Sequence, residues 1–501
     1  MEDFVHTLNA VIWSPALVAF CLGAGLFFSI KSRFVQLRLI PEMWRLLFQK
    51  KEDEIGLSSF QALSLTLAGR VGTGNIAGVA TAICFGGPGA LFWMWVVAFL
   101  GASSAFVEST LGQIYKERIE GQYRGGPAFY IERGLKLKAY AWAFAIVTIL
   151  ASCFFCPGVQ SNSIALAWNE AFGLDAEVTA AIVASITCFV IVGGLRRIAT
   201  FTSWVVPFMA QAYIVVALII VGVNWEQIPA VMTLIVNSAF GFDSLTGGML
   251  GAAIAWGVKR GIYSNEAGQG TGPHASSAAA VSHPAKQGLV QAFSVYIDTL
   301  FVCSATGFMI LMTGCYNMQT PDGSMIFEGL KGVEAGPVYT QAAIDQLMPG
   351  WGGPFIAITI FFFAFTTNLG YYYMAETNMA YLNRYIRKPV LMSACKAIFI
   401  GTVAFGAINS STLIWTMADV GVGTMAWLNL IAIMLLQKPA FIALKDYERQ
   451  LKDGLNPVFH PEQLGIANAT YWEGNRAEDN LAVEEESGVD NLTGLDPKNP
   501  V

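Results

Sequence analysis

Glycines at positions 72 and 74, followed by Ala77, give the stretch LAGRVGTGNIAGVATA (67–82) the spacing of a turn that holds a dinucleotide pyrophosphate. Such a site needs a β-strand before the glycines and an acidic residue about 20 positions after them. The preceding segment LSSFQALSLTLAGR has a helical pattern, and LFWMWVVAFLG (91–101) contains no acid. The pattern therefore argues against a nucleotide site and indicates an apolar helix interrupted by glycine.

The helix that carries these glycines is predicted to lie in a membrane. The chain of 501 residues is 54% hydrophobic and 13% charged, with a mean hydropathy of +0.52, whereas soluble domains carry about 25% charged residues. The first apolar run follows a segment with Glu2 and Asp3 but no Lys or Arg, so we expect a span and not a cleaved signal peptide. The predicted fold class is an all-α polytopic membrane protein.

Eleven runs are long enough to cross about 30 Å of hydrocarbon. They lie near residues 11–31, 57–83, 89–115, 139–157, 177–194, 204–223, 247–280, 287–313, 351–383, 390–408 and 411–436. Lys and Arg are concentrated in alternate loops, with six each in 31–56 and 116–138, as expected of cytoplasmic loops. We therefore expect a multi-pass protein of the plasma (inner) membrane, with its N-terminus outside and its C-terminus cytoplasmic.

Two of these spans carry glycine-rich interruptions. The first holds Gly69, Gly72, Gly74 and Gly78, and the second holds Gly257, Gly261, Gly268, Gly270, Gly272 and Pro273. Non-helical backbone is tolerated at membrane depth only where protein or a water-filled cavity satisfies it. Breaks five spans apart predict a 5+5 inverted repeat, with an extra N-terminal span in 1–31, one five-helix repeat in 57–223 and the second in 247–436.

An unwound turn of this kind can bind two types of ligand. Its free backbone N–H groups attract a carboxylate, and its free C=O groups attract a small hard cation. Glycine lets the backbone approach such ligands closely. A zwitterion and a metal ion are therefore the expected ligands. The alternative is that the glycines only allow close helix packing.

The sequence changes character after the last span, in residues 437–501. LKDYERQLKDGLN predicts a short cytoplasmic helix, and the acidic EGNRAEDNLAVEEESGVDNLTGLDPKNPV predicts a disordered tail. The eight cysteines fall almost entirely inside apolar segments, so we expect them to be core residues.

Three segments carry a family resemblance. GRVGTGNIAGVATA, GGPGALFWMWVVAFLG and RGIYSNEAGQGTGPHASSAA resemble signature segments of the alanine or glycine:cation symporter family, the sodium:alanine symporters. The resemblance covers the chain except its acidic tail. It implies a leucine-transporter-like fold preceded by one extra span, and uptake of a small neutral amino acid, such as alanine or glycine, with sodium as the coupling ion.

The resemblance also implies which residues form the sites. The substrate is expected at Thr73, Gly74, Asn75, Gln160, Trp256, Thr367 and Tyr371. Sodium is expected at the backbone C=O groups of Ala68 and Val71 and at the hydroxyls of Thr366 and Thr367, because such oxygen ligands suit a hard cation. Tyr371 stands where some members have Trp, which keeps glutamine or asparagine open as alternative substrates.

Eight ionisable residues fall inside the predicted spans, where each is costly unless it is paired or faces a cavity. They are Arg70, Glu108, Lys259, Arg260, Glu266, Asp298, Glu376 and Asp419. We expect some of them to pair with one another to hold gates or fix helices. The competing hypothesis is that Glu108, Glu266 or Asp298 relays a proton, which would make H⁺ the coupling ion.

Two other functional classes are disfavoured. The sequence contains no zinc-binding pair, nucleophile elbow or phosphate loop, so the chain is predicted not to be an enzyme. Its polar residues cluster at the two breaks rather than along one helix face, which argues against a channel. The expected partners are the amino acid and membrane lipid, with no nucleic acid and no obligate protein partner indicated.

Overall fold

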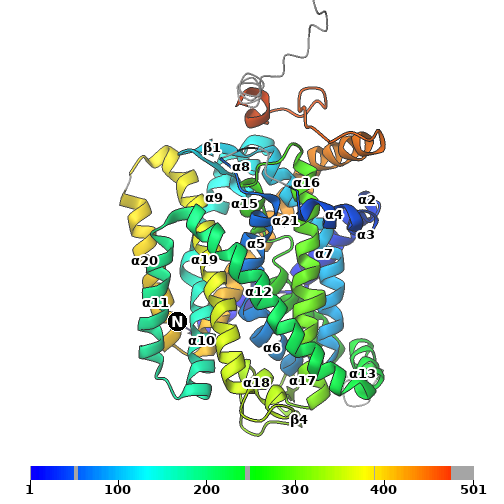
Figure 1. Cartoon of the computed structure of the whole chain (residues 1–501), viewed down its shortest axis with the longest axis vertical. Coiled ribbons are helices and arrows are strands. Elements are labelled where there is room, and N and C mark those ends of the chain that lie inside the picture. Colours follow the sequence, from blue (N-terminus) through cyan, green and yellow to red (C-terminus); the bar gives the residue numbers. More distant parts are fainter. Residues whose placement is uncertain (1, 50–52, 54, 243–248, 389, 476–501) are drawn as a thin grey trace, which may run out of the picture.

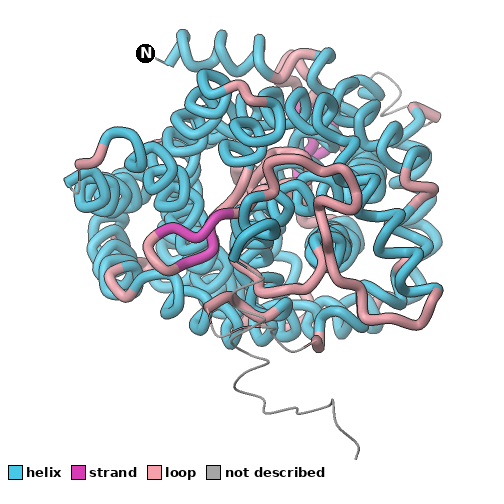
Figure 2. The backbone as a smooth tube through the Cα atoms, turned by 90° about the horizontal axis from the view of Figure 1, so that it is seen from above, coloured by secondary structure: helices cyan, strands magenta, loops and turns pink. Residues whose placement is uncertain are grey.

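Long helices form most of the structure. The computed structural model describes residues 2–49, 53, 55–242, 249–388 and 390–475. In this part of the chain, eight helical segments are long and apolar enough to cross a membrane. They are Asp3–Lys31, Gly89–Ile114, Lys138–Phe172, Gly194–Val223, Pro284–Thr313, Gly352–Ile386, Val390–Ile408 and Ser411–Lys452. Figure 1 shows these helices side by side, and Figure 2 shows the same bundle from above.

The elements follow one another along the chain, with η marking 3-10 or π-helical turns. The first half contains α1 (Glu2–Ile12), α2 (Pro15–Lys31), α3 (Val35–Arg38), α4 (Ile40–Leu47), α5 (Ser59–Arg70), η1 (Gly74–Gly78), α6 (Val79–Gly86), α7 (Gly89–Ile114), β1 (Glu117–Ile119), β2 (Gln122–Arg124), α8 (Pro127–Tyr130), η2 (Ile131–Leu135), α9 (Lys138–Ile149), η3 (Leu150–Phe155), α10 (Cys156–Phe172), α11 (Ala176–Ile191), α12 (Gly194–Val223), η4 (Trp225–Gln227) and α13 (Ile228–Phe240). The second half contains α14 (Leu250–Asn265), α15 (Gly272–Ser277), α16 (Pro284–Tyr296), η6 (Ile297–Cys303), α17 (Ser304–Thr313), β3 (Asn317–Gln319), β4 (Met325–Glu328), α18 (Pro337–Asp345), α19 (Gly352–Ile386), α20 (Val390–Ile408), α21 (Ser411–Lys452) and η7 (Tyr471–Asn475).

The predicted span near 57–83 is an interrupted helix. A capping box starts α5, because the Gln61 N–H donates to Ser58 Oγ and the Ser58 N–H donates to Gln61 Oε1. The helix ends at Arg70, and Val71 leaves the helical region with φ −78° and ψ 87°. The chain becomes helical again at η1 and α6. Thr73 is already helical, with φ −56° and ψ −30°, so the break is confirmed at Val71 and Gly72, and Gly74 and Asn75 lie in π-helical backbone.

The predicted span near 247–280 is also interrupted, between α14 and α15. Glu266, Gly268 and Gly270 have φ values of 55°, 84° and 85°, a left-handed conformation that glycine adopts at little cost. The second break therefore lies at Glu266–Thr271.

Two glycines of the same segment lie in intact helix. A Cβ built at Gly257 would lie 2.5 Å from the Ala90 carbonyl oxygen, and one built at Gly261 would overlap Val97 Cγ1. Both neighbours belong to α7. For Gly257 and Gly261 the packing alternative is therefore correct, since they let α14 approach α7 closely.

Two predicted loops are helical instead. The loop expected from residue 158 is occupied by α10, which continues from α9 through η3 to Phe172. Pro157 does not end this helix, because it stands in the first turn of α10, directly after the π-helical stretch, where a missing N–H is tolerated. The loop expected at 224–246 contains α13, which is too short to span a membrane and packs against α7.

The surface and the core fit the predicted class. Large exposed apolar side chains cover the outer faces of α11 and α12, including Phe189, Trp204, Phe208 and Leu218. Exposed apolar area of this extent marks a contact with lipid or another apolar partner. Seven of the eight cysteines are buried free thiols, and Cys188 is half-buried.

Short hairpins mark the two ends of the bundle (Figure 1). The antiparallel pair β1–β2, with Glu117 opposite Arg124, lies at one end. The pair β3–β4 and the helix α18 lie at the other end. We call these the β1 end and the β3 end.

The chain after α21 folds back over the β1 end. The expected short helix at LKDYERQLKDGLN is not separate, because α21 runs without interruption from Ser411 through Pro439 to Lys452. Residues 455–475, here called the C-terminal strap, then contact the bundle: the Phe459 N–H donates to the Ser282 carbonyl, and the Trp472 indole N–H donates to the Gln113 carbonyl. Residues 476–501 of the expected acidic tail lie outside the described residues.

Candidate functional site

The first break is held by side-chain oxygens from two directions. The Gly72 N–H donates to Asn75 Oδ1 at 2.8 Å, and the Thr73 N–H donates to Gln160 Oε1 of α10 at 3.2 Å. Gln160 is buried. The two N–H groups of the turn therefore donate to side-chain oxygen atoms rather than to backbone carbonyls.

Gly72 is the point where three helices converge. A Cβ built there would overlap Thr367 Oγ1 of α19 and would lie 3.2 Å from Gln160 Oε1 of α10. No side chain fits at this position without displacing one of these groups. The structure thus brings together Thr73, Gln160 and Thr367, three of the predicted substrate residues.

Asn75 joins the two broken helices through Asp298. The Asn75 amide donates to Asp298 Oδ1 at 2.6 Å, and Ser264 Oγ, one residue before the end of α14, donates to both carboxylate oxygens at 3.0 Å. Thr299 Oγ1 also donates to Asp298 at 2.7 Å. The sequence identified Asp298 as a costly ionisable residue and a candidate proton relay, but not as a partner of Asn75. No spacing pattern links positions 75, 264 and 298, so the fold alone reveals this contact.

Gly74 lies against the same part of α14. A Cβ built at Gly74 would come within 3.2 Å of Ser264 Cα and of the Tyr263 ring. This is tighter than ordinary van der Waals contact, so the two broken helices touch at Gly74. The candidate site is therefore the turn itself with the buried side chains of α10, α14, α19 and η6 that contact it.

The predicted sodium ligands separate into two groups. Ala68 and Val71 lie at the end of α5, beside the turn, and Thr367 faces Gly72. Thr366 instead places its hydroxyl 3.8 Å from Met209 Sδ of α12 and donates to the Phe362 carbonyl. The structure thus brings only Thr367, of the two threonines, to the turn.

The residues at the turn fit a hard cation. The Thr73 hydroxyl is buried and has no hydrogen-bond partner among the described residues. Backbone carbonyls of Ala68 and Val71 and the Thr367 hydroxyl lie on the neighbouring segments. A set made only of neutral oxygen atoms suits sodium and offers no soft ligand for a transition metal.

Of the two remaining predicted substrate residues, only Trp256 is separated from the turn. Tyr371 is buried one turn after Thr367 on the same face of α19. Trp256 stacks on Phe85 with ring centroids 4.8 Å apart and lines a separate cavity. The structure therefore does not bring Trp256 to the first break.

This cavity, here called the vestibule, has a volume of about 490 Å³. Its walls include Thr81 of α6, Ser163 of α10, Arg260 of α14 and Asp419 of α21. Gln319 of β3 also lines it, so it opens toward the β3 end. The Trp415 ring lines the vestibule, and its centroid lies 5.0 Å from that of the Tyr263 ring, which in turn lies against Gly74.

Buried ionisable residues pair in part as expected. Lys259 and Arg260 both contact Asp419, and Glu376 pairs with Arg124. Glu108 accepts from the Gly270 N–H at 3.1 Å and from the Asn429 amide at 2.7 Å, and thereby holds the second break. Pairing among the eight predicted residues is thus confirmed for Lys259 and Arg260 with Asp419. The partner of Glu376 is instead Arg124 of β2, and the donors to Glu108 are neutral groups.

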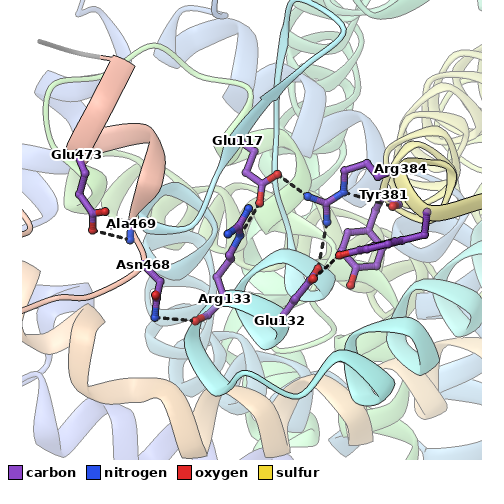
Figure 3. A network of polar contacts seen from close by, with 9 residues as sticks. Glu117, Glu132, Arg133, Tyr381, Arg384, Asn468, Ala469 and Glu473 are labelled. Atoms are coloured by element: carbon purple, nitrogen blue, oxygen red, sulfur yellow. Dashed lines mark hydrogen bonds and ion pairs between the residues drawn. The ribbon is translucent and has the colours of Figure 1, made fainter. Parts of the chain in front are cut away.

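An ion-pair network holds the β1 end together (Figure 3). Glu117 receives hydrogen bonds from Arg133 at 2.7 Å and from Arg384 of α19, and Arg384 also pairs with Glu132 at 3.1 Å. Burial raises the pKa of Glu132, but hydrogen bonds from Tyr385 and Tyr381 and the charge of Arg384 leave it below its usual value. Since an acid with a lowered pKa stabilises a fold at neutral pH and loses that effect only in acid, the network is intact near neutrality.

Comparison with known proteins extends over most of the chain. Residues 1–461 match the family model described as the sodium:alanine symporter family. The Bacillus subtilis protein YrbD is 59% identical over 94% of this chain and 98% of its own length. The sodium/proton-dependent alanine carrier protein of Bacillus sp. strain PS3 is 50% identical over 86% of this chain and 97% of its own length. The "Probable sodium/glutamine symporter GlnT" of Bacillus subtilis is 42% identical over 93% of this chain and 94% of its own length.

Proposed function

Because the chain belongs to the sodium:alanine symporter family, we propose that it is a sodium-coupled symporter that imports a small neutral amino acid, alanine or glycine, by alternating access. The observation that carries this proposal is the meeting of two broken helices at the Asn75–Asp298–Ser264 contacts, with Gln160 and Thr367 beside Gly72. Discontinuous helices that face each other near the midplane are typical of substrate and ion sites in secondary transporters.

The amino acid binds in this proposal with its carboxylate at the turn. The N–H groups of Gly72 and Thr73 exchange their side-chain acceptors, Asn75 and Gln160, for the carboxylate oxygens. The released Gln160 amide can then bind a polar group of the substrate. Sodium binds at the carbonyls of Ala68 and Val71 and at Thr367, where it offsets the negative charge of the carboxylate.

Two alternative functions are separated by specific observations. Glutamine or asparagine remains an alternative because Tyr371 stands where some members have Trp, and a more distant relative carries the name of a glutamine symporter. The observation in favour of proton coupling is the contact between Asp298 and Asn75. Protonation of a carboxylate that contacts the turn would change the hydrogen bonds of the turn and thereby the affinity for the substrate. Asp298 is thus the residue on which the proton alternative depends.

The direct test is uptake by the purified protein in proteoliposomes. With an inward sodium gradient and no pH gradient, we expect saturable accumulation of labelled alanine or glycine. A thermal-shift screen of the twenty amino acids, with and without sodium, identifies the substrate. Full uptake driven by a pH gradient in the absence of sodium would overturn the sodium proposal in favour of proton coupling, and glutamine as the best ligand would overturn alanine.

Sodium affinity is expected to depend on Thr367 and much less on Thr366. Thr367→Ala removes the hydroxyl that faces the turn, so the sodium concentration for half-maximal uptake should rise about tenfold, the equivalent of roughly 1.4 kcal/mol. Thr366→Ala is the matched control, because its hydroxyl lies against Met209. If both variants raise this sodium concentration equally, or if neither variant changes it, Thr367 does not belong to the sodium site.

We also propose an orientation in which the β3 end faces outward and the β1 end faces the cytoplasm, in an eleven-span arrangement with two inverted five-helix repeats. Arg133 and Arg384 lie at the β1 end (Figure 3), in agreement with the excess of positive charge expected inside. The vestibule then opens outward, while the ion pairs and the C-terminal strap cover the cytoplasmic side.

Labelling of single introduced cysteines in intact cells tests this orientation. A membrane-impermeant thiol reagent should label Ser324→Cys, in the exposed loop between β3 and β4, and should not label Arg118→Cys in β1. The unsubstituted chain is the control for its eight native cysteines. The reverse labelling pattern would invert the topology and with it the direction in which the vestibule opens.

A further inference from the structure

The base of the vestibule contains more positive than negative charge. Lys259 Nζ lies 2.6 Å and Arg260 Nη2 lies 2.7 Å from the same oxygen, Asp419 Oδ2. Arg260 and Asp419 side chains are only 3% and 4% exposed. Two cations therefore share one carboxylate at a depth where water cannot fully solvate them. Glu334 also lines the cavity but is exposed at its rim.

Three polar atoms of this group have no hydrogen-bond partner among the described residues. They are Arg260 Nε, Arg260 Nη1 and Asp419 Oδ1. A buried donor or acceptor without a partner costs free energy. Here two unpaired donors and one unpaired acceptor lie on a pair of residues that both line the vestibule. This arrangement is complementary to a zwitterion, whose carboxylate accepts from Arg260 and whose ammonium donates to Asp419.

Aromatic rings fix the orientation of the guanidinium. The Arg260 Cζ lies 4.6 Å from the Trp415 ring centroid and 5.2 Å from that of Trp256. Stacking of this kind holds the plane of an arginine and leaves its edge available for a carboxylate. The site also lies next to the first broken helix, since a Cβ built at Gly78 would come within 4.0 Å of both Trp415 and Arg260.

We propose that the base of the vestibule is an outer binding site for a zwitterionic amino acid, in which Arg260 binds the carboxylate and Asp419 binds the ammonium. The amino acid occupies this site before it passes the Tyr263 and Trp415 rings and reaches the turn at Gly72. The inference rests on the proposed function, because it requires that an amino acid is the substrate. It also gives Trp256 a role as a wall of the outer site.

Counting bound amino acids tests the proposal. Purified protein at saturating labelled L-alanine and sodium should bind two molecules per chain by equilibrium dialysis. The Arg260→Gln variant should bind one. In the Gly72→Ala background, where the inner turn is blocked, one molecule should remain bound, and adding Arg260→Gln should weaken its binding at least about tenfold. The matched control Lys259→Gln removes an equal charge beside the same carboxylate but leaves both unpaired guanidinium nitrogens in place, so its loss should be much smaller.

Competition identifies the ligand class. Propionate and ethylamine each lack one charged group of alanine, so both should compete for the Arg260-dependent site at least about tenfold less well than alanine. Propionate or chloride competing as well as alanine would mean an anion site and overturn the zwitterion proposal. One bound molecule in the unsubstituted chain, retained in Arg260→Gln, would also overturn it. No alanine bound to the unsubstituted chain would instead contradict the proposed function. If Gly72→Ala does not fold, the numbers of alanine molecules bound to the unsubstituted chain and to Arg260→Gln still test the outer site.

Discussion

Replacing Gly72 with alanine is expected to abolish amino-acid uptake. The added methyl group would overlap Thr367 Oγ1 and press on Gln160 Oε1, so the turn must shift away from both groups. Overpacking of this kind costs typically 1–3 kcal/mol, and the displaced N–H groups of residues 72 and 73 lose their position for a carboxylate. We expect uptake below about one hundredth of the unsubstituted rate, the equivalent of at least roughly 2.7 kcal/mol.

Gly78→Ala is the matched control for this prediction. It lies on the same broken helix, but the nearest atoms to its Cβ would be 3.9–4.0 Å away, which is ordinary contact. It should transport normally. Gly74→Val should be close to Gly72→Ala in severity, because even a Cβ there meets Ser264 and Tyr263 at 3.2 Å. Uptake and melting temperature should be measured together, and normal alanine affinity in a folded Gly72→Ala protein would remove this turn from the binding site.

Glu108→Ala is expected to destabilise the fold more than any change at the turn. Glu108 is fully buried and accepts hydrogen bonds from the Gly270 N–H and the Asn429 amide. Its loss leaves these donors unpaired and takes a counter-charge away from buried Arg70, whose Nη2 lies near Gly272 of the second broken helix. Removing one member of a buried charged group costs about 3–5 kcal/mol.

Thermal melting and denaturant unfolding in detergent measure this effect. Glu108→Gln should retain part of the stability, because its amide oxygen can still accept a hydrogen bond while its charge is lost. Glu328→Ala, at an exposed position of β4, should leave the melting temperature unchanged. Equal melting temperatures for Glu108→Ala and the unsubstituted chain would mean that Glu108 does not hold the second break.

Local composition predicted the two breaks because their cause is local. Glycines and polar residues gathered in an otherwise apolar run weaken the helix there, and non-helical backbone is tolerated at membrane depth only where protein or a cavity satisfies it. The structure interrupts both helices within such runs. The contact between Asn75 and Asp298, by contrast, joins positions 223 residues apart. No periodicity within either segment contains that information, so the sequence named Asp298 as a buried charge and a candidate proton relay but not as the partner of Asn75.

The errors in helix boundaries have equally specific causes. The predicted span near 139–157 stops at Pro157, yet the helix continues past this proline, which directly follows a π-helical stretch, to Phe172. The apolar segment of α13 is too short to span and was therefore assigned to a loop, although it packs against α7. Trp256 was assigned to the substrate turn, whereas the helical path of α14 carries it to the vestibule. In each case, packing against neighbouring helices, and not the local sequence, determines where the segment lies.

The C-terminal strap has a consequence for how the protein is made. Its contacts connect Trp472 to the end of α7 and Phe459 to Ser282, both of which are synthesised long before it. A chain emerging from the ribosome in N-to-C order can therefore insert and pack its spans while the β1 end is still uncovered. That end is covered only after residues 455–475 have been made, so closure of this face follows the packing of the spans beneath it.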